Sequence, residues 1–126
     1  MEPQNKKTIL LADDEQFIVI AYKDGLERAG YSVVVAHDGE EALQQAQATH
    51  PDLILLDLIM PKMNGFEVLR SLKEDANCAT IPVVVLTNLS QSNDEEEART
   101  AGAVDFVVKA DISLKDLLAR IEHIFA

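Results

Sequence analysis

The sequence predicts one α/β domain in which a doubly wound parallel sheet is covered by helices on both faces. Five short apolar runs alternate with stretches of helical pattern, at roughly 20 to 25 residues per repeat. The central runs are continuously apolar and rich in Val, Ile and Leu, which is typical of strands buried on both faces. A length of 126 residues fits a single compact domain.

Five strands are expected, separated by helix-forming sequence. The strands should cover residues 8–12, 31–36, 52–57, 82–87 and 105–109. The helix after the second strand follows "HDG" and runs to Thr49, because Pro51 disfavours helix in the residue before it. The next helix begins near Asn64. Right-handed crossovers between parallel strands place these helices on both sides of the sheet.

The last two helices carry recognisable start signals. The segment "SNDEEEARTAGA" (92–103) opens with a Ser/Asn cap and has acids in its first turns, where the helix dipole favours them. It has few apolar positions, so we expect light packing and mobility. The final helix follows Ser113, an expected N-cap, with Asp116 in its first turn and Leu and Ile repeating along one face.

Composition limits the classes of function. A net charge of −11 opposes direct contact with nucleic-acid phosphates, which requires a basic surface. The single cysteine, Cys78, cannot form an internal disulfide, which indicates a reducing compartment. Residues 1–6 are expected to be a flexible leader without the apolar segment of a signal peptide, and no run is long enough to span a membrane. We therefore expect a cytoplasmic protein that binds neither membranes nor nucleic acid.

Polar side chains follow four of the five expected strands. Asp13 and Asp14 end the first strand, Asp57 the third, Thr87 the fourth and Lys109 the fifth. Ligands of open α/β sheets bind beyond the carboxyl ends of the strands, so these side chains share one edge if the four strands are neighbours. Taken alone, Asp14 could cap a helix, Lys109 could be a surface residue and Thr87 an ordinary strand residue. Their joint placement is what indicates a site.

The joint pattern suits phosphoryl transfer assisted by a hard cation. Three carboxylates held close together repel one another unless a cation lies among them. Oxygen ligands without His or Cys favour Mg²⁺, or Mn²⁺, over Zn²⁺. Lys109 could then pair with one phosphate oxygen and Thr87 could donate to another, with Asp57 as the nucleophile that forms an aspartyl phosphate. Glu15 is assigned to the first turn of the following helix and left out of the site.

These motifs resemble the receiver domain of two-component response regulators, close to the single-domain chemotaxis type. The resemblance covers nearly the whole chain and rests on "LLADDE", "DLILLDLIMPKMNGFE", "VVVLTN" and "AVDFVVK". It implies a flavodoxin-like, three-layer α/β/α fold with strand order 2-1-3-4-5, and a receiver domain over residues 7–126.

The resemblance also implies how the acids act. Asp57 would accept a phosphoryl group from a sensor histidine kinase or a phosphotransfer protein, in a phosphorelay and not as an enzyme. Mg²⁺ would bind Asp14, Asp57 and the backbone carbonyl of Ile59, with Asp13 acting through a water molecule.

The remaining roles concern the response to phosphorylation. Lys109 would pair with the phosphoryl group. Thr87 and Phe106 would move, and the surface of the fourth helix, fifth strand and fifth helix would change for an unknown downstream partner. Phe106 replaces the Tyr found in many members of the family, so it can rotate but has no hydroxyl.

Other positions depart from the family pattern. Lys109 is followed by Ala110, where the family usually has Pro after a cis peptide bond, and a cis bond before Ala would cost about 3–4 kcal/mol. Asn88 follows the switch Thr where a small residue is usual, so it could narrow access to Asp57 or add a hydrogen bond to the phosphate. Ile59 and Leu89 should flank the site and cannot orient an attacking water, which predicts a long-lived phosphorylated state.

Two other classes of function fit less well. A degenerate receiver would bind partners without phosphorylation, but all five site residues are present. An Asp-nucleophile phosphatase of the haloacid-dehalogenase type would need an Asp-x-Asp motif after the first strand, and "ADDEQF" lacks that spacing. A nucleotide-binding domain is weaker still, since no Gly-rich loop follows any strand.

Overall fold

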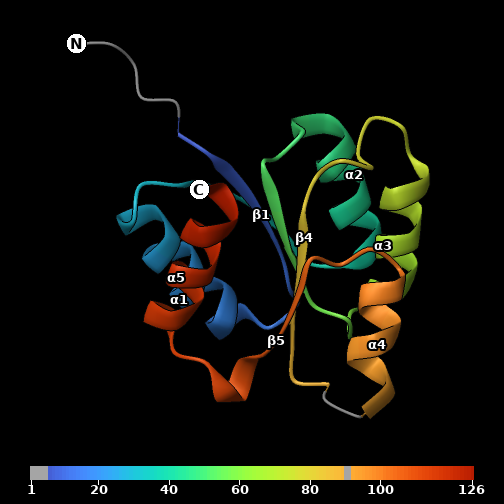
Figure 1. Cartoon of the computed structure of the whole chain (residues 1–126). Helices are drawn as coiled ribbons and strands as arrows, with labels where there is room; N and C mark the ends of the chain where they lie inside the picture. The colour runs from blue at the N-terminus through green and yellow to red at the C-terminus, as the bar shows by residue number, and fades with distance from the viewer. Residues whose placement is uncertain (1–5, 90–91) are drawn as a thin grey trace.

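A computed structural model describes residues 6–89 and 92–126, apart from the side chain of Ser92 (Figure 1). The strands are β1 (Thr8–Ala12), β2 (Ser32–Ala36), β3 (Leu53–Leu56), β4 (Val83–Thr87) and β5 (Asp105–Val108). The helices are α1 (Gln16–Arg28), α2 (Gly39–Thr49), α3 (Gly65–Glu74), α4 (Ser92–Thr100) and α5 (Leu114–Phe125), and the 3₁₀ turn η1 (Lys109–Asp111) precedes α5. Five of the six residues of the predicted leader lie outside the described residues.

The strands form one parallel sheet with the order β2-β1-β3-β4-β5, which confirms the predicted fold class and order. Ala12 pairs with Ala36 on one side and with Leu56 on the other. At the far side of the sheet, Thr87 pairs with Val108. This register brings the carboxyl ends of β1, β3, β4 and β5 to one edge, as the sequence predicted.

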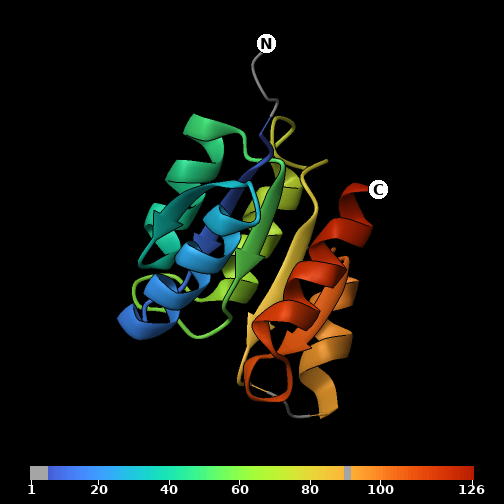
Figure 2. The same ribbon diagram turned by 90° about the vertical axis from the view of Figure 1, so that its left-hand side faces the viewer.

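Alternate residues of the central strands enter two separate cores. In β1, Ile9 and Leu11 pack with side chains of α1 and α5, while Leu10 and Ala12 pack with side chains of α2, α3 and α4. Figure 1 shows the corresponding three layers with the sheet in the middle, and Figure 2 looks onto the sheet with α1 and α5 in front of it. Full burial of a Leu or Ile side chain stabilises the fold by about 1.5–3 kcal/mol, so both faces of these strands select apolar residues.

Three helices begin with side-chain caps. Ser113 accepts the Asp116 N–H at the start of α5, as predicted, and Asp38 accepts the Glu41 N–H at the start of α2. Asn64 and Glu67 form a reciprocal capping box at the start of α3. The caps fix where α2, α3 and α5 begin after the loops that follow β2, β3 and β5.

The predicted Ser/Asn cap of α4 is wrong, because α4 already includes Ser92 and Asn93. The residue before α4 lies outside the described residues. Of the α4 side chains that the structure describes, Ala98 alone is buried. The predicted light packing is therefore confirmed, while the predicted mobility stays a prediction.

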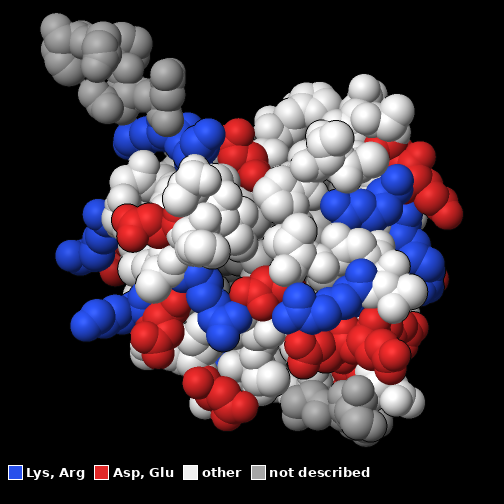
Figure 3. All heavy atoms as spheres, in the orientation of Figure 1, with Lys and Arg blue, Asp and Glu red and all other residues white. Residues whose placement is uncertain are grey.

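An ion-pair network links α4, β5 and α5. Asp105 of β5 contacts Arg99 of α4 at 3.3 Å and Arg120 of α5 at 2.7 Å. Arg99 also contacts Glu95 one turn earlier, at 3.0 Å. Acidic side chains gather over α4 on the surface (Figure 3). One aspartate thus bridges the two helices on either side of β5.

The ends of the domain lie at the edge opposite the polar strand ends. The chain enters β1 at Thr8, at the amino-terminal edge of the sheet, and α5 returns to that edge before it ends at Phe125 (Figure 1). No helix among the described residues is long and apolar enough to cross a membrane.

Candidate functional site

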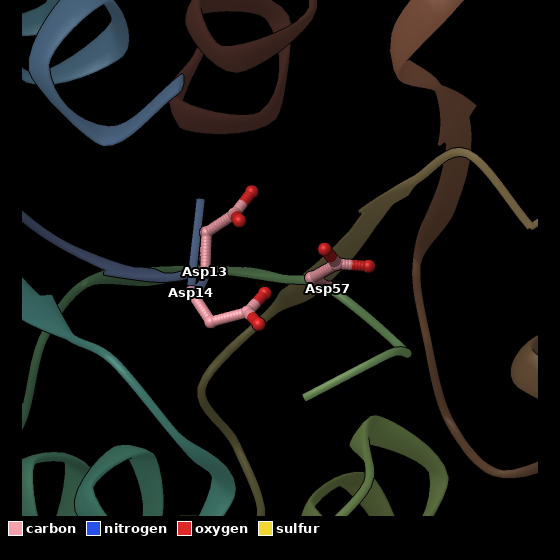
Figure 4. A group of neighbouring side chains, drawn as sticks. All are labelled: Asp13, Asp14 and Asp57. Atoms are coloured by element: carbon pink, nitrogen blue, oxygen red, sulfur yellow. The ribbon is translucent and has the colours of Figure 1, made fainter. Parts of the chain in front are cut away.

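Three carboxylates converge at the carboxyl edge of the sheet. Asp13 and Asp14 follow β1 and Asp57 follows β3, and one oxygen from each lies within 4.8 Å of the others. Figure 4 shows the three side chains beyond the ends of these two strands. Asp13 and Asp57 are buried and Asp14 is exposed. Such a group of oxygen ligands, partly open to solvent, fits a hard cation such as Mg²⁺.

Lys109 is the cation that the structure places among these acids. Its side chain is 3% exposed, and its Nζ lies 2.6 Å from Asp13 Oδ2 and 2.9 Å from Asp57 Oδ2. The same nitrogen lies 3.1 Å from Glu15 Oε1. Burial opposes the charge on this amine, but its hydrogen bonds to Asp13 and Asp57 outweigh burial and raise its pKa above the ordinary lysine value. Lys109 is therefore a fixed positive charge.

Asp13 experiences the opposite balance. Burial raises the pKa of its carboxyl above the ordinary value, and the hydrogen bonds from Lys109 and from the Glu15 N–H only partly offset that effect. One ammonium thus serves several carboxylates. Additional positive charge at this edge would lower the electrostatic free energy of the group.

Asp57 is held from several directions. Thr87 Oγ1 donates to Asp57 Oδ1 at 2.7 Å, and the Ile59 N–H donates to the same oxygen at 3.2 Å. Lys109 Nζ donates to Asp57 Oδ2. These contacts fix the orientation of the Asp57 carboxylate.

Gly65 allows the loop after Asp57 to fold back closely. The Gly65 N–H donates to Leu58 O at 2.9 Å, so the start of α3 lies directly against this loop. A Cβ at position 65 would collide with the backbone carbonyl of Asp57 and with Leu58 Cα. A side chain there would displace the segment that carries Asp57.

Comparison with known proteins identifies the family. Residues 9–122 match the response regulator receiver domain model. The chain belongs to this family. It is 34% identical over 103 residues to the polar-differentiation response regulator DivK of Brucella ovis, covering 82% of this chain and 84% of DivK.

Other relatives of this receiver domain are longer proteins. It is 40% identical over 120 residues to the alkaline phosphatase synthesis transcriptional regulatory protein PhoP of Bacillus subtilis, covering 95% of this chain but 48% of PhoP. The chain thus spans about half the length of this relative. Among solved structures, the chemotaxis response regulator CheY4 of Vibrio cholerae has a TM-score of 0.88 and 30% identity, with 95% of this chain and 99% of CheY4 covered.

The receiver domain brings all five predicted strand-end residues together. The contacts of Asp57 reach β4 through Thr87 and the end of β5 through Lys109, and the two remaining acids come from the end of β1. The alternative in which Asp14 caps α1 is not observed, because Glu15 is the N-cap residue and no side chain caps that end.

The structure also places the other residues that the sequence analysis named near the site. Phe106, on β5, is partly buried and packs against the core that faces α2, α3 and α4. Ile59 is 56% exposed next to Asp57, whereas Leu89 is partly buried against the core. The Lys109–Ala110 peptide bond is trans, like all those of the described residues, and Lys109 still reaches Asp57.

Sequence reasoning misplaced Glu15. The sequence predicts it in the first turn of α1 and outside the site, but it is the N-cap residue before the helix and its carboxylate contacts Lys109. The signal was its position directly after Asp13 and Asp14. The contact itself joins residues far apart in the chain, and no local pattern encodes it.

Proposed function

We propose that Asp57 accepts a phosphoryl group from a phosphohistidine of a sensor histidine kinase or a phosphotransfer protein, in a Mg²⁺-dependent reaction. One Asp57 oxygen forms a bond to phosphorus as the P–N bond breaks, and that electron pair returns to the imidazole. The observation that carries this proposal is the pair of contacts on the two Asp57 oxygens, from Thr87 Oγ1 at 2.7 Å and from Lys109 Nζ at 2.9 Å.

The neighbouring acids would hold the cation. Asp14, Asp57 and the backbone carbonyl of Ile59 are the proposed direct ligands, and Asp13 contributes through a water molecule. Bound Mg²⁺, or Mn²⁺, would neutralise charge on the phosphoryl oxygens. The support for this set is the mutual proximity of the three carboxylates and their all-oxygen chemistry.

Lys109 and Thr87 would stabilise the phosphorylated state. Lys109 transfers from Asp57 Oδ2 to a phosphoryl oxygen, and the Thr87 hydroxyl turns to another. Phe106 lies on β5, the strand paired with β4, and its ring would rotate inward as Thr87 moves toward the phosphoryl group. The surface of α4, β5 and α5 then changes shape for a downstream protein.

These roles make the protein a signalling component and not a turnover enzyme. We propose that residues 7–126 form the receiver domain and that it acts in the cytoplasm through protein partners. A degenerate receiver is disfavoured because the trans Lys109–Ala110 bond leaves the Lys109–Asp57 contact intact.

Phosphoryl uptake tests the proposal directly. With acetyl phosphate and Mg²⁺, the intact wild-type protein should gain the mass of one phosphoryl group, and Asp57→Asn should gain none. Asp52→Asn is the matched control, because Asp52 lies at the other end of β3 and its side chain accepts only the Thr8 N–H among the interactions described. Uptake by Asp57→Asn at the wild-type level, or none by the wild type, would overturn the assignment.

A further inference from the structure

A side chain joins the loops that follow β4 and β5. Asn88 comes directly after Thr87, and Ala110 comes directly after Lys109. The Ala110 N–H donates to Asn88 Oδ1 at 3.0 Å. Because Thr87 pairs with Val108 at the end of the β4–β5 ladder, this bond extends the link between the two strands beyond their last paired residues.

The bond fixes the backbone on the far side of Lys109. Val108, before it, is held in the sheet, and Ala110, after it, is held by Asn88. Asp57 follows β3, and β4 lies between β3 and β5 in the sheet. The Lys109 side chain must therefore extend past the end of β4 to reach Asp57. A small rotation of the 3₁₀ turn that begins at Lys109 would move its amine away from the carboxylates.

Asn88 and Ala110 are chemically matched to one another. A proline at position 110 would have no N–H to donate, and a small residue at position 88 would have no amide oxygen to accept it. Two of the positions at which the sequence departs from the family pattern, 88 and 110, therefore form the two halves of one hydrogen bond.

We infer that Asn88 is a positioning residue for Lys109, which it holds toward Asp57 through the Ala110 N–H. The inference rests on the proposed phosphoryl acceptance by Asp57. It differs from the alternative in which the bulk of Asn88 narrows access to the site. Positioning requires the amide oxygen, whereas obstruction requires only volume.

Three substitutions separate these two roles. Asn88→Ala removes both the acceptor and the bulk, Asn88→Leu keeps the bulk without the acceptor, and Asn88→Asp keeps an acceptor oxygen at the same place. The matched control is Asn77→Ala, an exposed asparagine between α3 and β4, at the opposite edge of the sheet.

The first measurement is hydrogen exchange at the Ala110 amide. Exchange should be at least about tenfold faster in Asn88→Ala and Asn88→Leu than in the wild type, and Asn88→Asp should retain protection. The second is the rate of phosphoryl uptake from acetyl phosphate with Mg²⁺. Asn88→Ala and Asn88→Leu should both be slower by roughly three- to tenfold, the range for one lost hydrogen bond, and Asn77→Ala should match the wild type.

The contrary outcomes are distinct. Faster uptake by Asn88→Ala with wild-type uptake by Asn88→Leu would show obstruction and overturn the inference. An unchanged exchange rate of the Ala110 amide in Asn88→Ala and Asn88→Leu would also overturn the inference, since the Asn88 side chain would then not restrain the Ala110 backbone. Either result leaves the proposed function intact if the wild type is phosphorylated, while a wild type that takes up no phosphoryl group overturns both proposals.

Discussion

Asp57 accepts two hydrogen bonds on Oδ1 but only the Lys109 hydrogen bond on Oδ2 among the interactions described, so Oδ2 is the oxygen with a lone pair available for the proposed attack on phosphorus. The Lys109 amine is the donor best placed to move, because it also contacts Asp13 and Glu15 and keeps those partners when it leaves Asp57. Its charge therefore stays compensated as it shifts toward a phosphoryl oxygen. A lysine paired with Asp57 alone would lose its only partner in the same step.

Ile59 controls the fate of the phosphorylated state in our interpretation. Its apolar side chain is 56% exposed beside Asp57 and cannot hydrogen-bond an attacking water. Ile59→Asn should therefore shorten the lifetime of the aspartyl phosphate, by roughly three- to tenfold, because an amide can orient that water. The measurement is the loss of phosphoprotein after the donor is removed.

The control for this experiment is Val104→Asn. Val104 is also an exposed apolar residue, but it precedes β5 at the opposite edge of the sheet. Adding Leu89→Glu to Ile59→Asn should shorten the lifetime further. Equal decay in the wild type, Ile59→Asn and the double variant would contradict the role given to these side chains.

At the scale of elements, α3 and α4 pack very differently on the same face of the sheet. In α3, Val68, Leu69 and Leu72 are buried and a capping box fixes the first turn. In α4, Ala98 is the one buried residue among the described side chains. Arg99 forms ion pairs with Glu95, which is exposed, and with Asp105, which is partly exposed. Exposed ion pairs contribute little, so α4 should be the less stable helix.

Hydrogen exchange tests that difference within a single sample. Amides of α4 should exchange at least about tenfold faster than those of α3, because local opening of α4 exposes little apolar surface. Adding Mg²⁺ and beryllofluoride, a phosphoryl mimic, should change the exchange of α4 more than that of α3. Equal protection of both helices before and after this addition would contradict the assignment of α4 to the switching surface.

At the scale of the whole molecule, the net charge of −11 and the three clustered carboxylates both favour the binding of a cation. The overall field attracts cations, and the cluster could hold a divalent cation. A ligand that binds only the folded state stabilises it by mass action, by about 2.7 kcal/mol at a hundredfold excess over its Kd.

Mg²⁺ should therefore raise the melting temperature of the wild-type protein. Asp14→Asn should reduce this shift, since Asp14 is proposed as a direct ligand, and Asp52→Asn should leave it unchanged. Thermal unfolding with Mg²⁺ and with a chelator provides the measurement. A shift of equal size in Asp14→Asn would remove Asp14 from the cation site, and no shift in the wild type at high Mg²⁺ would argue against the site as a whole.

The parts of the molecule that sequence predicted are those fixed by short-range patterns. Continuous apolar runs predicted both faces of the strands, and the polar residues after four strands predicted the edge where Asp57 meets Thr87 and Lys109. The contact of Glu15 with Lys109 and the bond between Asn88 and Ala110 were not predictable. Both depend on the direction in which individual side chains leave their loops, and residues distant in the chain determine that direction.

The parallel arrangement also has a practical consequence for experiments. Because β1 starts and α5 ends at the edge of the sheet away from Asp57, either end of the domain can be joined to a tag, a fluorophore or a solid support without covering the acidic cluster. A surface-immobilised domain would present the edge that carries the acidic cluster outward to a protein in solution. Binding assays in both orientations should therefore give the same affinity for a partner that docks at that edge.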